Sequence, residues 1–390
     1  MHRSPKTVIG GVRILMKVLL CGGGTAGHVN PAIAIADFIK ARHSEAEIRF
    51  VGTNYGIESK LVPRAGYPLT EIEVYGLKRK LSLENIRNVS KAVSAIGKSK
   101  RLLREFSPDL VIGTGGYVSG PLVWAACDLG IPTAIHEQNA FPGLTTRRLA
   151  SRVNLVMLGF ADAKARLTCK KSVLVGNPIR REILFADRAA ARERLEIKES
   201  ERLLVSFGGS MGSRRFNENI RELMALHCSE GRFRHIHAAG QFGIKWLPGE
   251  LEERGITPER YPLIDLREYI FNMEDVMAAA DLLICRAGAI TLGELAAMGK
   301  PSILIPSPNV TDNHQYYNAL AFAKVGAAEL LEEKDCSGQV LYDRVNTLLS
   351  DEEKLRSMSQ AAQQFAILDS TQRIYDSIAP FLRQGASQSV

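Results

Sequence analysis

A glycine-rich segment that contains a histidine, Gly22-Gly-Gly-Thr25-Ala-Gly27-His28, follows the apolar run Lys17–Leu20 and precedes a helical pattern from Pro31. Glycine lets a backbone approach a ligand closely, and a helix N-terminus attracts anions. The imidazole of His28 can take up a proton near neutral pH. We therefore expect a loop for an anionic or polar ligand, with His28 either taking part in the chemistry or capping the helix.

This segment does not fit two common nucleotide-binding motifs. Its glycines have dinucleotide spacing, but the next strand ends at Val51-Gly-Thr53 without an acidic residue to hold an adenosine ribose. An ATPase phosphate loop needs Lys and Ser or Thr where His28 and Val29 stand. We expect neither a nicotinamide cofactor nor ATP hydrolysis.

Three further segments place glycine or polar side chains after apolar runs. They are Gly113-Thr-Gly-Gly-Tyr117-Val-Ser-Gly-Pro121, His136-Glu-Gln-Asn139 and Gly208-Gly-Ser210-Met-Gly-Ser-Arg214. Ligands bind where the strands of an open parallel sheet end. We expect each of the three segments to contact a ligand, and segment 208–214 to bind a phosphate group. For segment 136–139 the alternative is that its polar side chains are buried and structural.

Two segments of the second half have groups suited to a nucleotide sugar. Arg286-Ala-Gly288-Ala289-Ile-Thr291-Leu-Gly-Glu294 is a small-residue turn followed by a carboxylate that can accept two ribose hydroxyls, although a lone helix glutamate is more often simply exposed. The amides of Asp312-Asn-His314-Gln315-Tyr-Tyr-Asn318 can hold sugar hydroxyls. No Asp-x-Asp pair and no Cys or His cluster at zinc spacing occurs, so we predict no metal site.

The elements around these segments indicate an α/β fold. The chain has 390 residues, which favours two large domains, and strands are predicted at Lys17–Leu20, Ile48–Val51, Leu110–Ile112, Thr133–Ile135, Leu203–Phe207, Leu282–Ile284 and Ser302–Ile305. Glycine-rich turns and helical patterns follow them, as in parallel sheets with crossover helices. We place the domain boundary near Gly176-Asn-Pro-Ile-Arg180 and treat residues 1–15, which precede Met16, as a dispensable extension.

The charge is distributed unevenly. Residues 1–182 contain 27 Lys and Arg against 13 Asp and Glu, a net charge of +14. Residues 183–390 contain 23 Lys and Arg against 29 Asp and Glu, a net charge of −6. Residues 78–104 contain nine basic residues and one acidic residue, with apolar residues at helical spacing. This segment is typical of a helix on an anionic membrane surface, although core packing more commonly explains such spacing.

Six scattered cysteines favour a reducing cytoplasm. The run from Ile14 to Cys21 includes Lys17 and leads into glycines, so we interpret it as a strand and not as a signal peptide or a spanning helix.

Taken together and in order, these motifs resemble the MurG family of peptidoglycan glycosyltransferases. The resemblance covers the chain from Met16 onward, and its motifs are Gly22–Pro31, Gly115–Pro121, His136–Asn139, Gly176–Arg180, Gly208–Arg214, Arg286–Glu294 and Asp312–Asn318. It implies a fold of the GT-B type, in which two Rossmann-like domains with parallel sheets face a central cleft. It also implies inverting transfer of N-acetylglucosamine from UDP-GlcNAc to the C4 hydroxyl of the muramyl sugar of lipid I.

The resemblance also implies roles for individual residues. Domain 16–179 would bind the acceptor and face the membrane, with His28 as the candidate base and contacts from Thr25, Gly115, Gly116, Tyr117, His136 and Glu137. Domain 180–390 would bind the donor, and its C-terminal helix would pack back on the first domain. The donor contacts implied are Thr25, Gly27, Asn139, Arg180, Ser210, Ile270, Ala289, Ile290, Thr291, Glu294, His314 and Gln315.

The expected protein is a peripheral enzyme at the cytoplasmic face of the plasma membrane, with no cofactor and no nucleic-acid partner, its divalent-ion requirement left open. Three rivals remain: a UDP-GlcNAc epimerase, another lipid glycosyltransferase of this fold, and a non-catalytic sugar-nucleotide or lipid-carrier binding protein. The basic segment 78–104 argues against a purely soluble epimerase, because epimerisation needs no lipid acceptor.

Overall fold

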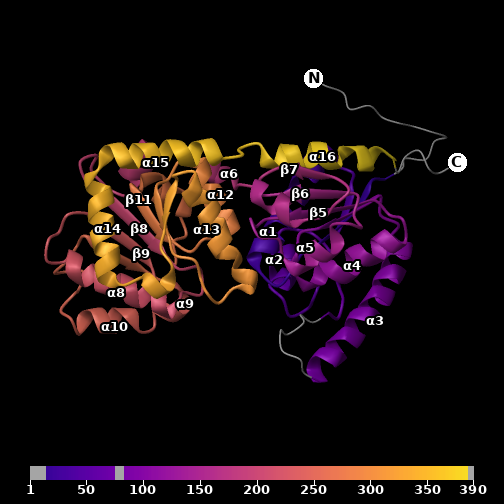
Figure 1. The fold of residues 1–390 in the computed structure, drawn as a ribbon, viewed down its shortest axis with the longest axis horizontal. Helices are drawn as coiled ribbons and strands as arrows, with labels where there is room; N and C mark the ends of the chain where they lie inside the picture. The colour runs from indigo at the N-terminus through magenta and orange to yellow at the C-terminus, as the bar shows by residue number, and fades with distance from the viewer. Residues whose placement is uncertain (1–14, 75–82, 385–390) are drawn as a thin grey trace. The chain divides into compact units, whose positions relative to one another are not determined.

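The computed structural model describes residues 15–74 and 83–384, except for the side chains of 83–93 and 383–384. Within them the chain forms two compact units (Figure 1). Unit 1 contains the described residues up to Gln138, Pro142–Pro178 and the chain from Asp369; unit 2 contains Asn139–Phe141 and Ile179–Leu368. The chain thus leaves unit 1 inside the segment where the sequence placed the boundary, and it returns at Asp369. The predicted extension, 1–15, lies almost wholly outside the described residues.

Unit 1 is built on a seven-stranded sheet of order β3-β2-β1-β4-β5-β6-β7, in which every pair is parallel. Its strands are Lys17–Cys21, Glu47–Gly52, Leu69–Glu71, Leu110–Gly113, Thr133–Glu137, Leu155–Leu158 and Ser172–Leu174, β1 to β7. Its helices are α1 (Ala26–Arg42), α2 (Glu58–Arg64), α3 (Leu83–Phe106), α4 (Gly116–Asp128), α5 (Leu144–Leu149), η1 (Ala161–Arg166) and α16 (Ser370–Gln384).

Unit 2 has a six-stranded parallel sheet of order β10-β9-β8-β11-β12-β13. Its strands, β8 to β13, are Leu203–Phe207, Arg234–Ala238, Ile264–Arg267, Leu282–Cys285, Ser302–Leu304 and Ala328–Leu330. Its helices are α6 (Arg181–Leu184), α7 (Arg188–Arg194), α8 (Arg214–His227), α9 (Gly240–Gly243), α10 (Leu247–Glu252), α11 (Met273–Ala279), α12 (Ala289–Ala297), η2 (Thr311–Asn313), α13 (His314–Lys324), η3 (Glu333–Asp335), α14 (Gly338–Ser350) and α15 (Glu352–Phe365).

Both sheets change their winding direction at one pair of neighbouring strands. The pair is β1 and β4 in unit 1, and β8 and β11 in unit 2. Open α/β sheets bind ligands outside the carboxyl ends of such a pair. The predicted strands are all present to within two residues, and the α/β fold class with two Rossmann-like sheets is confirmed.

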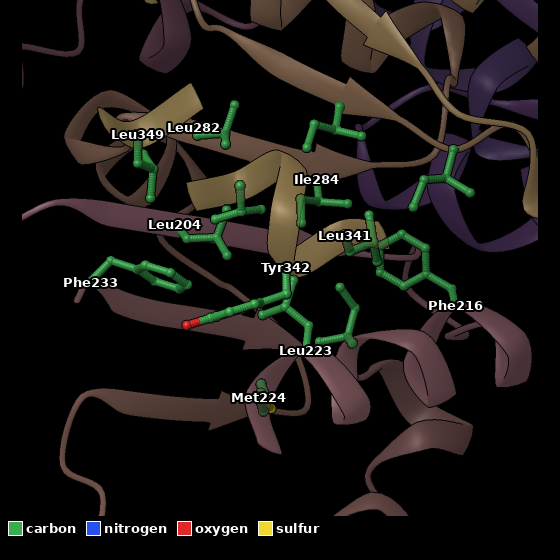
Figure 2. Packing of buried hydrophobic residues seen from close by; sticks show 14 of the residues in the cluster. Leu204, Phe216, Leu223, Met224, Phe233, Leu282, Ile284, Leu341, Tyr342 and Leu349 are labelled. Atoms are coloured by element: carbon green, nitrogen blue, oxygen red, sulfur yellow. The ribbon is translucent and has the colours of Figure 1, made fainter. Parts of the chain in front are cut away.

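Buried aliphatic side chains fix the helices to each sheet. Figure 2 shows the core of unit 2, where Leu204, Leu282 and Ile284 of the sheet meet Leu223 of α8 and Leu341 of α14. All five side chains are fully buried. This packing holds α8 against the sheet and so fixes the glycine-rich turn that leads into it.

The C-terminal helix α16 packs on α1 of unit 1. Ile374 and Ile378 of α16 are 1% and 0% exposed and belong to the same hydrophobic cluster as α1. Nε2 of His43, just after α1, lies 2.7 Å from the hydroxyl of Tyr375. The last helix therefore supports the helix that begins beside the first glycine-rich turn.

The basic segment is helical over Leu83–Phe106, as its apolar spacing predicts. Residues 78–82 lie outside the described part of the chain. Lys100 pairs with Asp128 at 2.8 Å, and Lys98 lies 3.8 Å from Glu73, so acidic residues distant in sequence neutralise part of the predicted basic surface. None of the helices in the described ranges combines the length and apolar composition that crossing a membrane requires.

Candidate active site

His28 lies in the first turn of α1, not in the loop before it. The sequence predicted a helix from Pro31, but α1 begins at Ala26, because Thr25 is extended and its carbonyl accepts the first helical N–H groups. Pro31 is tolerated because the carbonyl that it leaves without a helical donor belongs to Gly27, which is exposed to water. Thr25 and Gly27 therefore stand exposed beside His28 at the helix end.

The imidazole of His28 is held through Nδ1. This atom lies 3.0 Å from the carbonyl oxygen of Gly23 and 3.2 Å from Oγ1 of Thr25. Because a carbonyl only accepts, Nδ1 carries the proton, and in the neutral ring Nε2 is the basic nitrogen. The ring packs on Gly115, where a Cβ would come within 2.8 Å of Cδ2. The geometry suits a general base.

The second glycine-rich turn is shorter than the sequence indicated. Helix α4 begins at Gly116, so most of 113–121 is helix and only the turn at Gly115 joins it to β4. Gly116 has φ 80°, and a Cβ there would lie 2.2 Å from the carbonyl oxygen of Gly23. The two turns therefore touch, and Tyr117 in the first turn of α4 lies against them.

Two backbone amides of the first turn are already used within unit 1. Gly23 N donates to the carbonyl of Gly115 at 3.4 Å, and Gly24 N donates to Oε2 of Glu58 at 3.1 Å. We expected this turn to receive an anion, and these two N–H groups are directed elsewhere. The first amides of α1, at Ala26 and Gly27, have no partner within a helix and so remain suited to an anion.

His136 and Glu137, predicted acceptor contacts, are 1% and 4% exposed in β5. Nε2 of His136 donates to the carbonyl of Gly176 at 2.9 Å, and Nδ1 accepts from Gln138 at 3.1 Å. Burial lowers the pKa of His136, which keeps the ring neutral. Oε2 of Glu137 accepts from Gly143 N at 3.0 Å. These bonds favour a structural role for His136, and its contact with the acceptor stays a prediction.

Unit 2 has a pocket of about 490 Å³ where β8 and β11 end. The turn after β8 forms one wall, the start of α12 another, and the turn after β12 the third. Of the predicted donor contacts, Thr291 and Gln315 line it. Its other lining residues are Phe207, Gly208, Gly209, Gly212, Ser213, Arg214, Arg286, Gly288, Ser307, Asn309 and Val310.

The N-terminus of α12 borders this pocket. Ala289, Ile290 and Thr291 form its first turn, which contains no acidic residue. The first N–H groups of a helix have no acceptor within the helix and carry the positive end of its dipole, which here applies to Ile290 and Thr291. A turn of this kind suits a diphosphate, and the donor contact that the family resemblance implies for these residues stays a prediction.

Glu294, one turn further along α12, pairs with Arg180. Nε of Arg180 lies 2.7 Å from Oε1 of Glu294, whose side chain is 9% exposed. Partial burial would lower the pKa of Arg180, but the hydrogen bond and charge of Glu294 outweigh it and raise that pKa. The structure thus pairs two predicted donor ligands with each other, a relationship that the sequence did not indicate.

Gln315 and His314 begin α13, after a turn in which Asp312 and Asn313 have φ of 54° and 51°. This left-handed conformation costs energy in side chains other than glycine and commonly marks functional sites. Oε1 of Gln315 accepts from Ser307 N at 2.9 Å, so the side chain can offer its amide nitrogen only as a donor. Nδ1 of His314 donates to the carbonyl of Thr311 at 2.8 Å.

The other predicted donor residues have different environments. Oδ1 of Asn139 accepts from Asn318 at 3.1 Å, which ties residues 139–141 to α13. Ile270 is 1% exposed with its backbone included, and its backbone contact with the uracil stays a prediction. Ser210 is exposed in the turn after β8, and its carbonyl accepts from Gln241.

Two residues that hold the site have no predicted role. Arg286 is 9% exposed and bonds Ser213 Oγ at 2.5 Å, the carbonyl of Ile305 at 3.1 Å and the carboxylate of Glu333. It therefore ties two pocket walls together. Glu58 is 0% exposed under the first glycine-rich turn. Arg286 lies in a motif that the sequence analysis identified, so its place near the site could have been inferred. No motif surrounds Glu58 in the sequence, so its place could not.

Across the described residues, no group of three or more His, Cys, Asp or Glu is arranged to hold a metal ion.

Comparisons with known proteins agree with this geometry. The N-terminal domain of glycosyltransferase family 28 matches residues 18–158, and the C-terminal domain of that family matches residues 203–374. The UDP-N-acetylglucosamine–N-acetylmuramyl-(pentapeptide) pyrophosphoryl-undecaprenol N-acetylglucosamine transferase of Acetivibrio thermocellus is 44% identical over 376 residues, covering 95% of this chain and 100% of that protein.

The transferase of the same name from Ruminiclostridium cellulolyticum is 44% identical over 362 residues, covering 92% of this chain and 98% of that protein. The crystal structure of Acinetobacter baumannii MurG matches with a TM-score of 0.77 and 28% identity, covering 94% of this chain and 99% of that one. The chain therefore belongs to glycosyltransferase family 28 and, within it, to the MurG family.

Proposed function

We propose that this chain transfers N-acetylglucosamine from UDP-N-acetylglucosamine to the C4 hydroxyl of the muramyl sugar of lipid I, giving lipid II for peptidoglycan synthesis. The observation that carries the proposal is the similarity to transferases of that name over nearly the whole chain. The pocket of unit 2, bordered by the start of α12, would supply groups for the donor, and the histidine at the start of α1 would supply one for the acceptor.

The donor belongs to unit 2 in this proposal. The first amides of α12 and the guanidinium of Arg180 would bind the diphosphate, and Glu294 would accept the ribose hydroxyls. Gln315 and Asn139 would hold the sugar, while the backbone of Ile270 would meet the uracil. As UDP departs, negative charge grows on its oxygen, and helix N-terminal amides with an arginine stabilise such charge.

The acceptor belongs to unit 1. Nε2 of His28 would take the proton of the C4 hydroxyl as its oxygen attacks the anomeric carbon from the face opposite UDP. The bond from that carbon to the UDP oxygen breaks, and UDP leaves with the electron pair. The result is inversion at the anomeric carbon, with the proton on His28 until solvent removes it. Thr25, Tyr117 and the first amides of α1 would position the lipid-linked sugar.

A lipid-linked acceptor calls for an enzyme at a membrane. We place this one at the cytoplasmic face of the plasma membrane as a peripheral protein, held in part by the basic segment 78–104. Arg101 and Arg104 of that segment are exposed, whereas Lys100 is committed to Asp128. We propose that the enzyme has no resident cofactor, and activity after chelation and after adding back Mg²⁺ tests this.

The decisive assay incubates the full chain with labelled UDP-GlcNAc, with and without a lipid I analogue. We expect label in the lipid, one UDP per transferred sugar and a β linkage to C4. Conversion of UDP-GlcNAc to its 2-epimer without acceptor would instead identify an epimerase. Binding of UDP-GlcNAc without turnover would indicate a binding protein.

A further inference from the structure

We propose that Glu58 is the positioning carboxylate of His28 and acts on it through the peptide bond between Gly23 and Gly24. This inference rests on the proposed function, in which His28 is the base. The N–H of that peptide belongs to Gly24 and donates to Oε2 of Glu58 at 3.1 Å. The C=O of the same peptide belongs to Gly23 and accepts from Nδ1 of His28 at 3.0 Å. One amide group therefore joins the carboxylate to the imidazole.

Glu58 is built into this position. It is 0% exposed, and its other oxygen, Oε1, accepts from the backbone N–H of Thr53 at 3.1 Å and from the hydroxyl of Thr53 at 2.6 Å. A buried carboxylate is tolerated only where hydrogen bonds replace its lost water. A Cβ at Gly23 would come within 2.7 Å of Oε1. The backbone of the turn therefore packs directly against the carboxylate of Glu58.

The linking peptide needs such a restraint. It lies between two glycines, and Gly24 has φ 84°, so side chains place no limit on its orientation. With its N–H directed to Glu58, its C=O must point the opposite way, toward Nδ1. Rotation of this peptide would remove the carbonyl that only accepts and leave Nδ1 beside the hydroxyl of Thr25, which can also donate. The other tautomer would then become available, in which Nε2 carries the proton and cannot act as a base.

The negative charge of Glu58 adds a second effect. It polarises the peptide, which strengthens the carbonyl as an acceptor and favours positive charge on the imidazole once the proton of the acceptor sugar has been taken up. The same charge disfavours a phosphate at Gly23 and Gly24. Besides His28, the titratable side chains of Glu58 and Tyr117 contact this turn. Glu58 therefore supports base chemistry at His28 more than diphosphate binding there.

The test compares Glu58→Gln with Val62→Ala. Glutamine keeps the size of the side chain but removes the charge. Val62 is 0% exposed on the same short helix α2 and touches no part of the turn's hydrogen bonding, so Val62→Ala reproduces a loss of packing alone. The exposed Glu71→Gln controls for loss of a charge in the same unit.

Selective ¹⁵N labelling of histidine in the full chain reads the tautomer without substrate, and a His28→Ala spectrum assigns the signal. We expect the Nδ1–H tautomer in wild type and Val62→Ala, and a rise of the Nε2–H tautomer in Glu58→Gln. We also expect Glu58→Gln to lower kcat roughly 10- to 100-fold. Losses of this size are typical when a residue that hydrogen-bonds and orients a metal-binding histidine is replaced. The KM of UDP-GlcNAc should be unchanged.

A Glu58→Gln enzyme that retains both the Nδ1–H tautomer and its kcat overturns the inference, and so does a Val62→Ala enzyme with the same changes. If Glu58→Gln does not fold, hydrogen exchange in wild type decides instead. Slow exchange at the Gly24 amide, in an exposed residue, supports the bond to Glu58, and rapid exchange refutes it. A wild-type chain with the Nδ1–H tautomer but without transfer overturns the proposed function alone.

Discussion

Arg180 and Glu294 form an ion pair in unit 2, with Nε of the first 2.7 Å from Oε1 of the second. The arginine is 48% exposed and the glutamate 9% in their side chains. A carboxylate so buried needs a charged partner or a ligand to replace its lost water. UDP-GlcNAc would therefore bind to a pair that is already formed, and ribose hydroxyls would add to its hydrogen bonds.

Glu294→Ala should weaken donor binding. Two ribose hydroxyls would lose a charged acceptor, and a hydrogen bond to a charged group is worth roughly 1.5–3 kcal/mol. The KM of UDP-GlcNAc should rise at least about tenfold, since 1.4 kcal/mol corresponds to a factor of ten. Glu329→Ala, which removes a partly exposed carboxylate paired with Arg344, is the control. An unchanged donor KM in folded Glu294→Ala would remove this residue from the ribose site.

Ile378→Ala should destabilise unit 1, although residue 378 follows the whole of unit 2 in the sequence. Ile378 is 0% exposed against the core that contains α1, and such truncations cost about 2–5 kcal/mol. With Trp246→Phe, Trp124 remains as the reporter of unit 1 in urea unfolding, because the chain has 2 tryptophans. The exposed Asp376→Asn on the same helix should leave the midpoint unchanged. Equal midpoints for both variants would contradict the packing of α16 on α1.

Unit 2 should lose stability as the pH falls from 6.5 toward 4. Oγ of Ser206 bonds His235 at 2.7 Å and His237 at 2.8 Å, and both rings are 0% exposed. Burial lowers the pKa of His237 to about 4 and that of His235 well below 6.5, helped by the charges of its neighbours His237 and His227. Unfolded histidines bind protons in this window and folded ones do not, so the free energy of unfolding falls.

The loss can reach about 1.4 kcal/mol per pH unit for each histidine. Urea unfolding followed through Trp246 in a Trp124→Phe chain measures it. His237→Gln should make the free energy of unfolding depend less on pH. Leu223→Ala, which creates a cavity in the same core, should lower this free energy equally at each pH. A slope that His237→Gln leaves intact would rule out this histidine as its source.

Binding to anionic vesicles should weaken with salt and with neutralisation of Lys78, Arg79, Lys80 and Arg87 together. Each basic residue near an anionic surface contributes about 1 kcal/mol, and salt screens it. Lys100→Gln is the control, because Lys100 pairs with Asp128 in unit 1. Vesicle sedimentation that responds to Lys100→Gln, and not to the fourfold change, would place the membrane surface elsewhere.

The strands and glycine-rich turns could be predicted because their signals are local: an apolar run such as Leu203–Phe207 followed directly by glycines. The role of Glu58 could not, since it depends on Gly24, 34 positions earlier in the chain. For the same reason the sequence could not predict the ion pairs of Lys100 with Asp128 and of Arg180 with Glu294. The sequence placed His136 after a strand, where ligands bind, but it is the penultimate residue of β5, is 1% exposed and bonds Gly176 and Gln138.

The most direct test of the account is the steady-state kinetics of His28→Ala with both substrates varied. As a general base, His28 contributes a factor of roughly 10²–10⁴, so kcat should fall by that much while the KM of UDP-GlcNAc stays near its wild-type value. If His28 instead bound the acceptor diphosphate, the KM of lipid I would rise and kcat would be largely retained. A folded His28→Ala enzyme with wild-type kinetics for both substrates would contradict the account.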